Sequence, residues 1–113
     1  TVFTDVNHTM TLMREESFGP IIGIQKVRGD DEAVALMNDT RYGLTAGVFT
    51  RDEARARELL ARVNAGSVYW NCCDRVSPRL PWSGHGDPGI GLTLSTHGVQ
   101  TFTRPKAWHL RQP

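Results

Sequence analysis

The stretch Arg14-Glu15-Glu16-Ser17-Phe18-Gly19-Pro20 leads directly into the apolar run Ile21-Ile22-Gly23-Ile24. Gly19 allows backbone angles that other residues avoid, and Pro20 fixes the angle that follows. The sequence therefore predicts a shaped loop that delivers an acid and an aromatic ring to the end of a strand. A carboxylate has only acceptor oxygens, which suit paired donors such as two ribose hydroxyls, and an aromatic ring can cover a flat ligand. The same residues also fit an ordinary helix end, with solvated glutamates and Phe18 in the core.

Beyond this stretch, segments of strand and helix character alternate along the chain. Residues 21–27, 44–50 and 67–70 are rich in β-forming side chains and are each predicted to be a strand. Residues 31–38 and 53–63 lie between them and carry apolar side chains at helical spacing. This order, with short links, predicts an α/β fold in which right-handed crossovers join a mainly parallel sheet.

The second of these helices has signals at both ends. Thr50 and Glu53 have the spacing of a capping box, which predicts Thr50 as the N-cap. Gly66 stands just past the helix, where a C-terminal glycine is expected. The helix is predicted to pack into the core through one stripe, formed by Ala56, Leu59, Leu60 and Val63.

The pattern Glu-Glu-x-Phe-Gly-Pro at residues 15–20 resembles a signature in the C-terminal part of the NAD(P)-dependent aldehyde dehydrogenases. One such motif would be weak evidence, but further landmarks of that family follow in one register over essentially the whole chain. They are Asn38, Tyr42-Gly43-Leu44, Val48-Phe49-Thr50, Ala65-Gly66-Ser67-Val68, Asn71, Pro81-Trp82, Gly84, Gly89, Gly91, Gly98, Phe102-Thr103 and Lys106.

The resemblance implies an enzyme that, when intact, oxidises an aldehyde to a carboxylic acid with NAD or NADP. It implies that Glu16 contacts the nicotinamide ribose and that Phe18 lies beside the nicotinamide. It also implies that Asp74, Val76 and Trp82 line the channel by which the aldehyde enters. The family's nucleophilic cysteine and general base lie in upstream sequence. No catalytic residue is therefore expected here, and the fragment alone is expected to be inactive.

A second class of function stays open, namely a non-enzymatic oligomerisation or binding module derived from the same fold. Upstream sequence would decide between the two, because only the enzyme needs a nucleophilic cysteine and a nucleotide-binding domain. The chain begins with Thr1 rather than Met, and we expect sequence to precede it.

One region departs from the family pattern. Ser83 stands where a glycine is usual, and Asp87-Pro88-Gly89 stands where a Ser-Gly pair usually follows a basic stretch. Proline removes a backbone donor and stiffens the loop. The resemblance therefore does not fix the geometry of residues 82–91, at the substrate end of the site.

Three other patterns suggest chemistry that the sequence does not support. Residues 84–89 match G-x-G-x-x-G, but they follow a proline-rich loop rather than a strand and leave too little chain for a dinucleotide fold. Cys72 and Cys73 end an apolar strand and are predicted to be small buried residues rather than nucleophiles. The four histidines are scattered without ligand spacing, so no metal site is predicted.

Composition limits the classes of protein to which the chain can belong. Of the 113 residues 39% are hydrophobic and 22% charged, and 13 basic against 12 acidic residues give a net charge of +1. This balance argues against a nucleic-acid partner, and no apolar run is long enough to span a membrane. The only two cysteines are adjacent, which excludes a disulfide scaffold within the chain and fits a reducing compartment, for which we expect the cytoplasm.

Residues 1–100 are predicted to be the C-terminal portion of a catalytic domain, and residues 101–113 an oligomerisation arm. Phe102 begins a β-forming run, Trp108 and Leu110 lie two apart on one face of an extended chain, and Arg111 is the last of three basic residues that limit unintended pairing. We expect this arm to form an intersubunit strand in a homo-oligomer, a dimer or a tetramer, as the resemblance also implies. A frayed terminus is the alternative.

Overall fold

The computed structural model of the chain describes residues 1–73 and 75–113. Its strands form three separate pairs rather than the one sheet predicted, and two of the pairs, β1–β2 and β4–β5, are parallel. The predicted α/β class with mainly parallel strand pairing is therefore confirmed, although the strands form small separate sheets. In chain order the elements are β1 (Val2–Phe3), α1 (Thr11–Arg14), β2 (Ile22–Gly23), α2 (Asp30–Asn38), β3 (Tyr42–Gly43), β4 (Thr45–Val48), α3 (Glu53–Arg62), β5 (Ser67–Trp70), β6 (His85–Gly86) and α4 (Ser95–Gln100).

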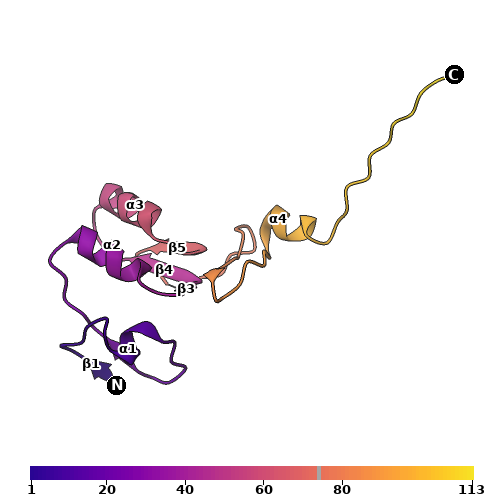
Figure 1. Cartoon of the computed structure of the whole chain (residues 1–113). Coiled ribbons are helices and arrows are strands. Elements are labelled where there is room, and N and C mark those ends of the chain that lie inside the picture. Colours follow the sequence, from indigo (N-terminus) through magenta and orange to yellow (C-terminus); the bar gives the residue numbers. More distant parts are fainter. Residues whose placement is uncertain (74) are drawn as a thin grey trace.

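Helices α2 and α3 and the parallel strands β4 and β5 form the main layer of the structure (Figure 1). The two strands pair over four residues, and α3 packs against both of them while α2 packs against α3. Val34 of α2 and Ala56 and Leu59 of α3 are buried between these elements. The helical stripe predicted from the sequence is therefore confirmed as the packing face of α3.

The ends of α3 differ from the prediction. Its N-cap is Asp52, whose carboxylate accepts from the Arg55 backbone N–H at 3.0 Å, so the assignment of Thr50 as the N-cap was wrong. The helix ends at its C-cap Val63, and Gly66 does not terminate it. Gly66 is required for another reason, because a Cβ atom there would lie 1.9 Å from the backbone oxygen of Ser83. The sequence therefore indicated correctly that a glycine is needed at this position. The reason is a close crossing of two backbone segments rather than the end of the helix.

Strands β1 and β2 and the short helix α1 form the N-terminal lobe, residues 1–24. Val6 is its buried core residue among the described part of the chain. The strand predicted at residues 21–27 shortens to Ile22–Gly23, because β1 provides a pairing partner of only two residues. Apolar side chains on both strands remain exposed, so this lobe lacks an apolar cover within the chain.

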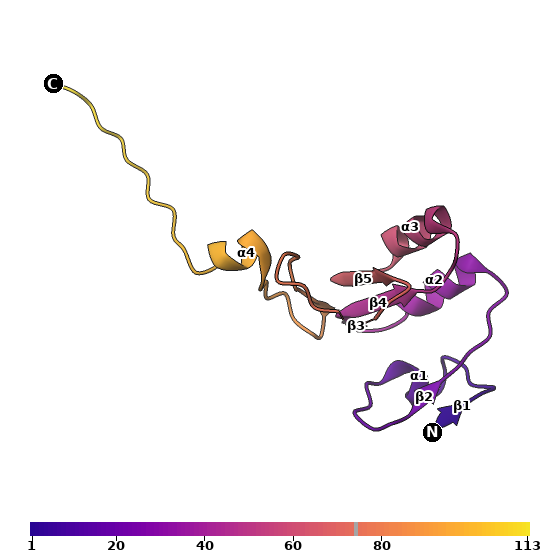
Figure 2. The same ribbon diagram turned by 180° about the vertical axis from the view of Figure 1, so that it is seen from behind.

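The chain as a whole is elongated, and its C-terminal arm, residues 101–113, extends away from the rest beyond α4 (Figures 1 and 2). The principal extents are 77 × 32 × 22 Å and the radius of gyration is 19.1 Å, whereas a compact domain of about 100 residues has a radius of roughly 13 Å. Described residues 102–113 pair with no other strand of this chain, and their apolar side chains are exposed. The arm is therefore a segment without intrachain cover.

Candidate functional site

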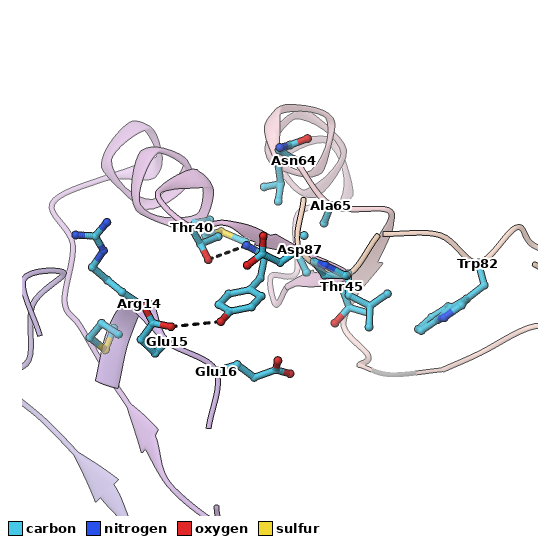
Figure 3. A pocket seen from close by; sticks show the side chains of 17 residues that line it. Arg14, Glu15, Glu16, Thr40, Thr45, Asn64, Ala65, Trp82 and Asp87 are labelled. Atoms are coloured by element: carbon cyan, nitrogen blue, oxygen red, sulfur yellow. Dashed lines mark hydrogen bonds between the residues drawn. The ribbon is translucent and has the colours of Figure 1, made fainter. Parts of the chain in front are cut away.

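A groove of about 720 Å³ opens between the N-terminal lobe and the main layer, as the close view in Figure 3 shows. One wall is the end of α1, with residues 13–16. The facing wall is the segment of β3 and β4, residues 42–46, together with the turn after α3 at residues 63–65. Trp82 and the 87–88 turn close the far end. Four parts of the sequence that are distant from one another thus contribute to a single groove.

An ion-pair network lies beside this groove and is centred on Arg41. Nη2 of Arg41 donates to a Glu15 carboxylate oxygen at 2.6 Å and to the Tyr42 hydroxyl at 2.7 Å. The Tyr42 hydroxyl donates in turn to the same Glu15 oxygen at 3.3 Å, and Arg41 Nε lies 3.1 Å from an Asp87 carboxylate oxygen. The hydrogen bond with Tyr42, followed by the charges of Glu15 and Asp87, raises the pKa of the Arg41 guanidinium. The Arg41 guanidinium at the centre of the network therefore stays positively charged at working pH.

Glu16 lies at the groove, but its neighbour in the predicted site, Phe18, does not. The Glu16 side chain lines the groove wall and leaves the backbone in a different direction from Glu15 (Figure 3). Within residues 1–73 and 75–113 the Glu16 carboxylate has no hydrogen-bond partner, so its acceptor oxygens are available to a ligand with donor groups. Phe18 is 96% exposed and contacts none of the groove walls. The alternative of Phe18 as a core residue of this chain is therefore wrong.

The predicted substrate-channel residues are divided between two hollows. Trp82 is half-buried, lines the large groove, and is fixed by backbone hydrogen bonds with Thr93 at 2.8 and 3.0 Å. It also lines a smaller hollow of about 190 Å³ together with both sequence neighbours of Val76, which is itself exposed. Asp74 lies outside the described residues. Trp82 is therefore the side chain that connects the large groove with the loop that carries Val76.

The loop that departs from the family pattern has a defined geometry. β6 pairs antiparallel with β3, and the backbone N–H of Asp87 donates to the Arg41 carbonyl at 3.0 Å. Gly86 has φ +72°, and a Cβ atom there would lie 2.1 Å from that same carbonyl oxygen, so only glycine fits. The next helix, α4, begins at Ser95. Residues 84–89 therefore form a short strand and turn, not a phosphate-binding strand–loop–helix.

The remaining candidate groups lie apart from the groove. Cys72 is half-buried and Cys73 is exposed, so the prediction that both are buried is wrong for Cys73 within this chain. Over residues 1–73 and 75–113 no group of three or more His, Cys, Asp or Glu side chains is arranged to hold a metal ion. Across the same residues, no helix has the length and apolar character needed to cross a membrane.

The sequence did not identify Arg41 and Tyr42 as members of the site. Arg41 contacts Glu15 across 26 residues of sequence, and no local pattern reports a contact of that range. The sequence offered one weak indication of these two residues. Tyr42 is the first residue of the Tyr42-Gly43-Leu44 motif that resembles the family, and Arg41 directly precedes it.

Comparison with known proteins shows similarity to the aldehyde dehydrogenase family. The profile of the aldehyde dehydrogenase family matches residues 1–108. A betaine aldehyde dehydrogenase of Mesorhizobium japonicum is 39% identical over 107 residues, which are 95% of this chain and 22% of that protein. The NAD(P)+ aldehyde dehydrogenase 1 of Saccharomyces cerevisiae is 38% identical over 110 residues, 97% of this chain and 22% of the relative.

The structural comparison agrees with the sequence comparison. The crystal structure of a betaine aldehyde dehydrogenase from Staphylococcus aureus in complex with NAD+ has a TM-score of 0.86 and 31% identity to this chain. It is matched over 89% of this chain and 20% of its own. The chain thus spans about a fifth of the length of the proteins it matches.

Proposed function

The chain belongs to the aldehyde dehydrogenase family, and we propose that it forms the C-terminal part of an enzyme that oxidises an aldehyde to a carboxylic acid with NAD+ or NADP+. The observation that carries this proposal is the Glu16 carboxylate, which lines the large groove without a hydrogen-bond partner among the described residues. The neighbouring Glu15 is already paired with Arg41, whereas Glu16 has both carboxylate oxygens available to a ligand. The relatives named above support the choice of reaction.

In this proposal Glu16 accepts hydrogen bonds from the hydroxyls of the nicotinamide ribose, which are paired donors. The bound nicotinamide supplies the acceptor for the hydride that leaves the aldehyde carbon. Glu16 does not take part in that transfer; it orients the ribose and thereby the ring attached to it. Phe18 is exposed two residues later and provides an apolar face for the nicotinamide.

We propose that the loop carrying Val76 and Trp82 forms the substrate side of the site. We propose that Trp82 and Val76, with Asp74, line the entrance for the aldehyde. Trp82 contributes an apolar wall that excludes water from the groove, and its position is fixed by the paired backbone hydrogen bonds with Thr93. Val76 is exposed in this chain and is available to contact a substrate or another part of the enzyme.

The covalent chemistry of the proposed reaction is assigned to sequence outside these residues. Cys72 and Cys73 lie at the end of β5, away from the residues that line the groove. Among the described residues neither cysteine forms a recorded contact with a cationic side chain, one of the features that activate a thiolate. The competing function, a binding or oligomerisation module, is less favoured, because relatives that match 95% and 97% of this chain are named aldehyde dehydrogenases.

We also propose that the C-terminal arm joins a partner subunit, so that the enzyme is a homo-oligomer. Phe102, Trp108 and Leu110 are all exposed, and Lys106 Nζ lies 4.6 Å from the centre of the Trp108 indole ring. Apolar side chains at such density on one extended segment are typical of a surface that is buried on association.

The proposed function is tested by Glu16→Gln in the intact enzyme. The amide replaces one acceptor with a donor and removes the charge, so NAD(P)+ binding should weaken by about 1.5–3 kcal/mol, the usual contribution of hydrogen bonds to a charged group. The KM for the aldehyde should change little. Isothermal titration calorimetry measures the cofactor Kd, and steady-state kinetics measures both KM values.

Glu58→Gln, on the solvent face of α3, makes the same chemical change away from the groove and is the control. Wild-type cofactor affinity in Glu16→Gln would contradict the proposal. A lower Tm without any change in cofactor affinity would assign Glu16 a structural role instead.

A further inference from the structure

We infer that Arg41 is a positioning residue for the cofactor site: by binding Glu15 it fixes the backbone that presents the Glu16 carboxylate to the groove. This inference rests on the proposed function of Glu16. Arg41 itself is not among the residues that line the groove, so it acts through Glu15 rather than on a ligand. The basis of the inference is the contact between Arg41 and Glu15, at 2.6 Å.

Few tertiary contacts hold the end of α1: Leu12 and Met13 lie against Gly23 of β2, and the Glu15 side chain reaches the β3 side of the groove. The helix has only four residues, none of them is buried, and its N-cap makes no side-chain hydrogen bond. A helix this short is not stable by itself, so its position depends on tertiary contacts. The Glu15 side chain supplies such a contact at the end of α1, where it meets both Arg41 and the Tyr42 hydroxyl.

Glu15 and Glu16 are coupled through the backbone between them. Glu15 has φ −105° and ψ 146°, an extended conformation in which successive side chains point to opposite sides. Figure 3 shows the Glu15 and Glu16 side chains leaving the chain in different directions, and the Glu15 carboxylate accepts from the Tyr42 hydroxyl. Fixing one side chain in such a conformation fixes the direction of the next. Arg41 therefore reduces the range of positions that Glu16 samples before a ligand binds.

The charges in this region make the role of Arg41 stronger. Glu15, Glu16 and Asp87 all lie at the groove walls, and Arg41 is the cation that pairs with two of these three carboxylates. Without the guanidinium, repulsion between the carboxylates favours separation of the α1 end from the 85–89 loop. An exposed single ion pair contributes little to stability, but here one guanidinium makes three contacts in a network.

The two sides of the groove depend on Arg41 in different ways. Arg41 binds the α1 end through its guanidinium alone, which contacts Glu15. The 85–89 loop is bound also by its backbone, since the Asp87 N–H donates to the Arg41 carbonyl and Gly86 pairs with Tyr42 in the β3–β6 ladder. A substitution of the Arg41 side chain removes the first attachment and leaves the backbone part of the second. Cofactor binding should therefore be affected more than aldehyde binding.

The test uses the intact enzyme with Arg41→Gln, Arg41→Lys, Glu15→Gln and the double variant Arg41→Gln/Glu15→Gln. Arg41→Gln should raise the KM and Kd for NAD(P)+ by roughly three- to tenfold, the range expected of a small ion-pair network, and change the aldehyde KM by less than about twofold. Arg41→Lys should restore part of the affinity, because its ammonium can still pair with Glu15. The double variant should be no weaker than the weaker single variant, since both changes remove the same contact.

The control is Arg57→Gln, which removes an exposed ion pair of similar length, 2.7 Å to Glu53, on the outer face of α3. It should leave both KM values unchanged. Hydrogen exchange measured on residues 11–20 gives a readout that does not require turnover, and it should rise in Arg41→Gln but not in Arg57→Gln.

If Arg41→Gln binds NAD(P)+ with the wild-type Kd while Glu16→Gln binds it more weakly, the positioning role of Arg41 is overturned. The proposed function of Glu16 then still stands. Wild-type Kd in Glu16→Gln would overturn the proposed function, and faster exchange over residues 11–20 in Arg41→Gln would then support only the mechanical attachment. Equal increases in both KM values of Arg41→Gln, with a lower Tm, would also overturn the inference, because they indicate general destabilisation.

Discussion

The main layer and the N-terminal lobe are built from the same kind of unit, a parallel strand pair next to a helix, but they bury their apolar residues to very different extents. In the main layer Ala56 is 1% exposed and Leu59 is 9% exposed. In the N-terminal lobe Ile22, on strand β2, is 58% exposed. The difference arises because the ten-residue α3 packs against both β4 and β5, with α2 packed against α3, whereas the four-residue α1 cannot cover β1 and β2.

The comparison teaches that one part of this chain carries its own core and the other does not. The accessible surface is 9373 Å², while a compact monomer of this mass exposes about 6,200 Å². Exposed apolar side chains on the N-terminal lobe and the C-terminal arm contribute to this excess. The chain spans about a fifth of its relatives, and these faces are the places where the rest of an intact enzyme would pack.

The largest effect is expected from removal of the C-terminal arm. A version of the intact enzyme that ends at Thr101 should have a smaller oligomeric mass, because Phe102, Trp108 and Leu110 would be lost from the proposed subunit contact. Light scattering or sedimentation measures the mass. Removal of residues 111–113 alone leaves these apolar side chains in place and should not change the mass. If the mass is the same in all versions, the arm does not carry the contact.

A substitution at Ile22 tests whether the exposed lobe is covered in the intact enzyme. Ile22→Ala should then lower stability by about 2–5 kcal/mol, as for a residue inside a core, although Ile22 is exposed in this chain. Leu59→Ala, whose side chain is buried within this chain, is the reference for a true core residue, and Glu58→Ala on the solvent face of α3 is the control. Thermal unfolding measures the three variants. An effect of Ile22→Ala as small as that of Glu58→Ala would show that the lobe stays exposed.

The smallest effect is expected at the N-cap of α3, within the region that has its own core. Asp52→Ala removes the acceptor for the Arg55 backbone N–H and should lower stability by about 1 kcal/mol. Asp52→Asn keeps an acceptor oxygen and should retain most of the stability. The shift in Tm of the intact enzyme measures both. If Asp52→Ala unfolds at the wild-type temperature, the cap is not needed once the helix is packed.

Much of the main layer could be predicted from the sequence, because its signals are local. The stripe on α3 repeats at helical spacing, and residues 67–70 form β5 with the bounds predicted. The strand at residues 21–27 was predicted too long because its length depends on a partner strand, which local patterns do not report. The N-cap was placed at Thr50 because two residues two positions apart both offer an acceptor oxygen, and only the backbone path selected Asp52.

The candidate site was predictable in part. The motif at residues 15–20 identified the family and directed attention to Glu16, which the structure places at the groove, while the positions of Phe18 and Val76 relative to a ligand remain predictions. The network of Arg41 with Glu15 and Asp87 could not be predicted. Each of these side chains is an ordinary exposed charge in the sequence, and only their meeting in space makes them a unit.

The α/β class, the alternation of three strands and two helices over residues 21–70, and membership of the aldehyde dehydrogenase family follow from the sequence, because periodicity and motifs are properties of neighbouring residues. Tertiary structure alone decided which loops meet at the groove, why Gly66 and Gly86 must be glycines, and how Arg41 connects two walls of the site. These features depend on backbone crossings and ion pairs between residues far apart in the chain. The physical reason is that close contact and charge pairing act through space, and linear order records them only when the partners are neighbours.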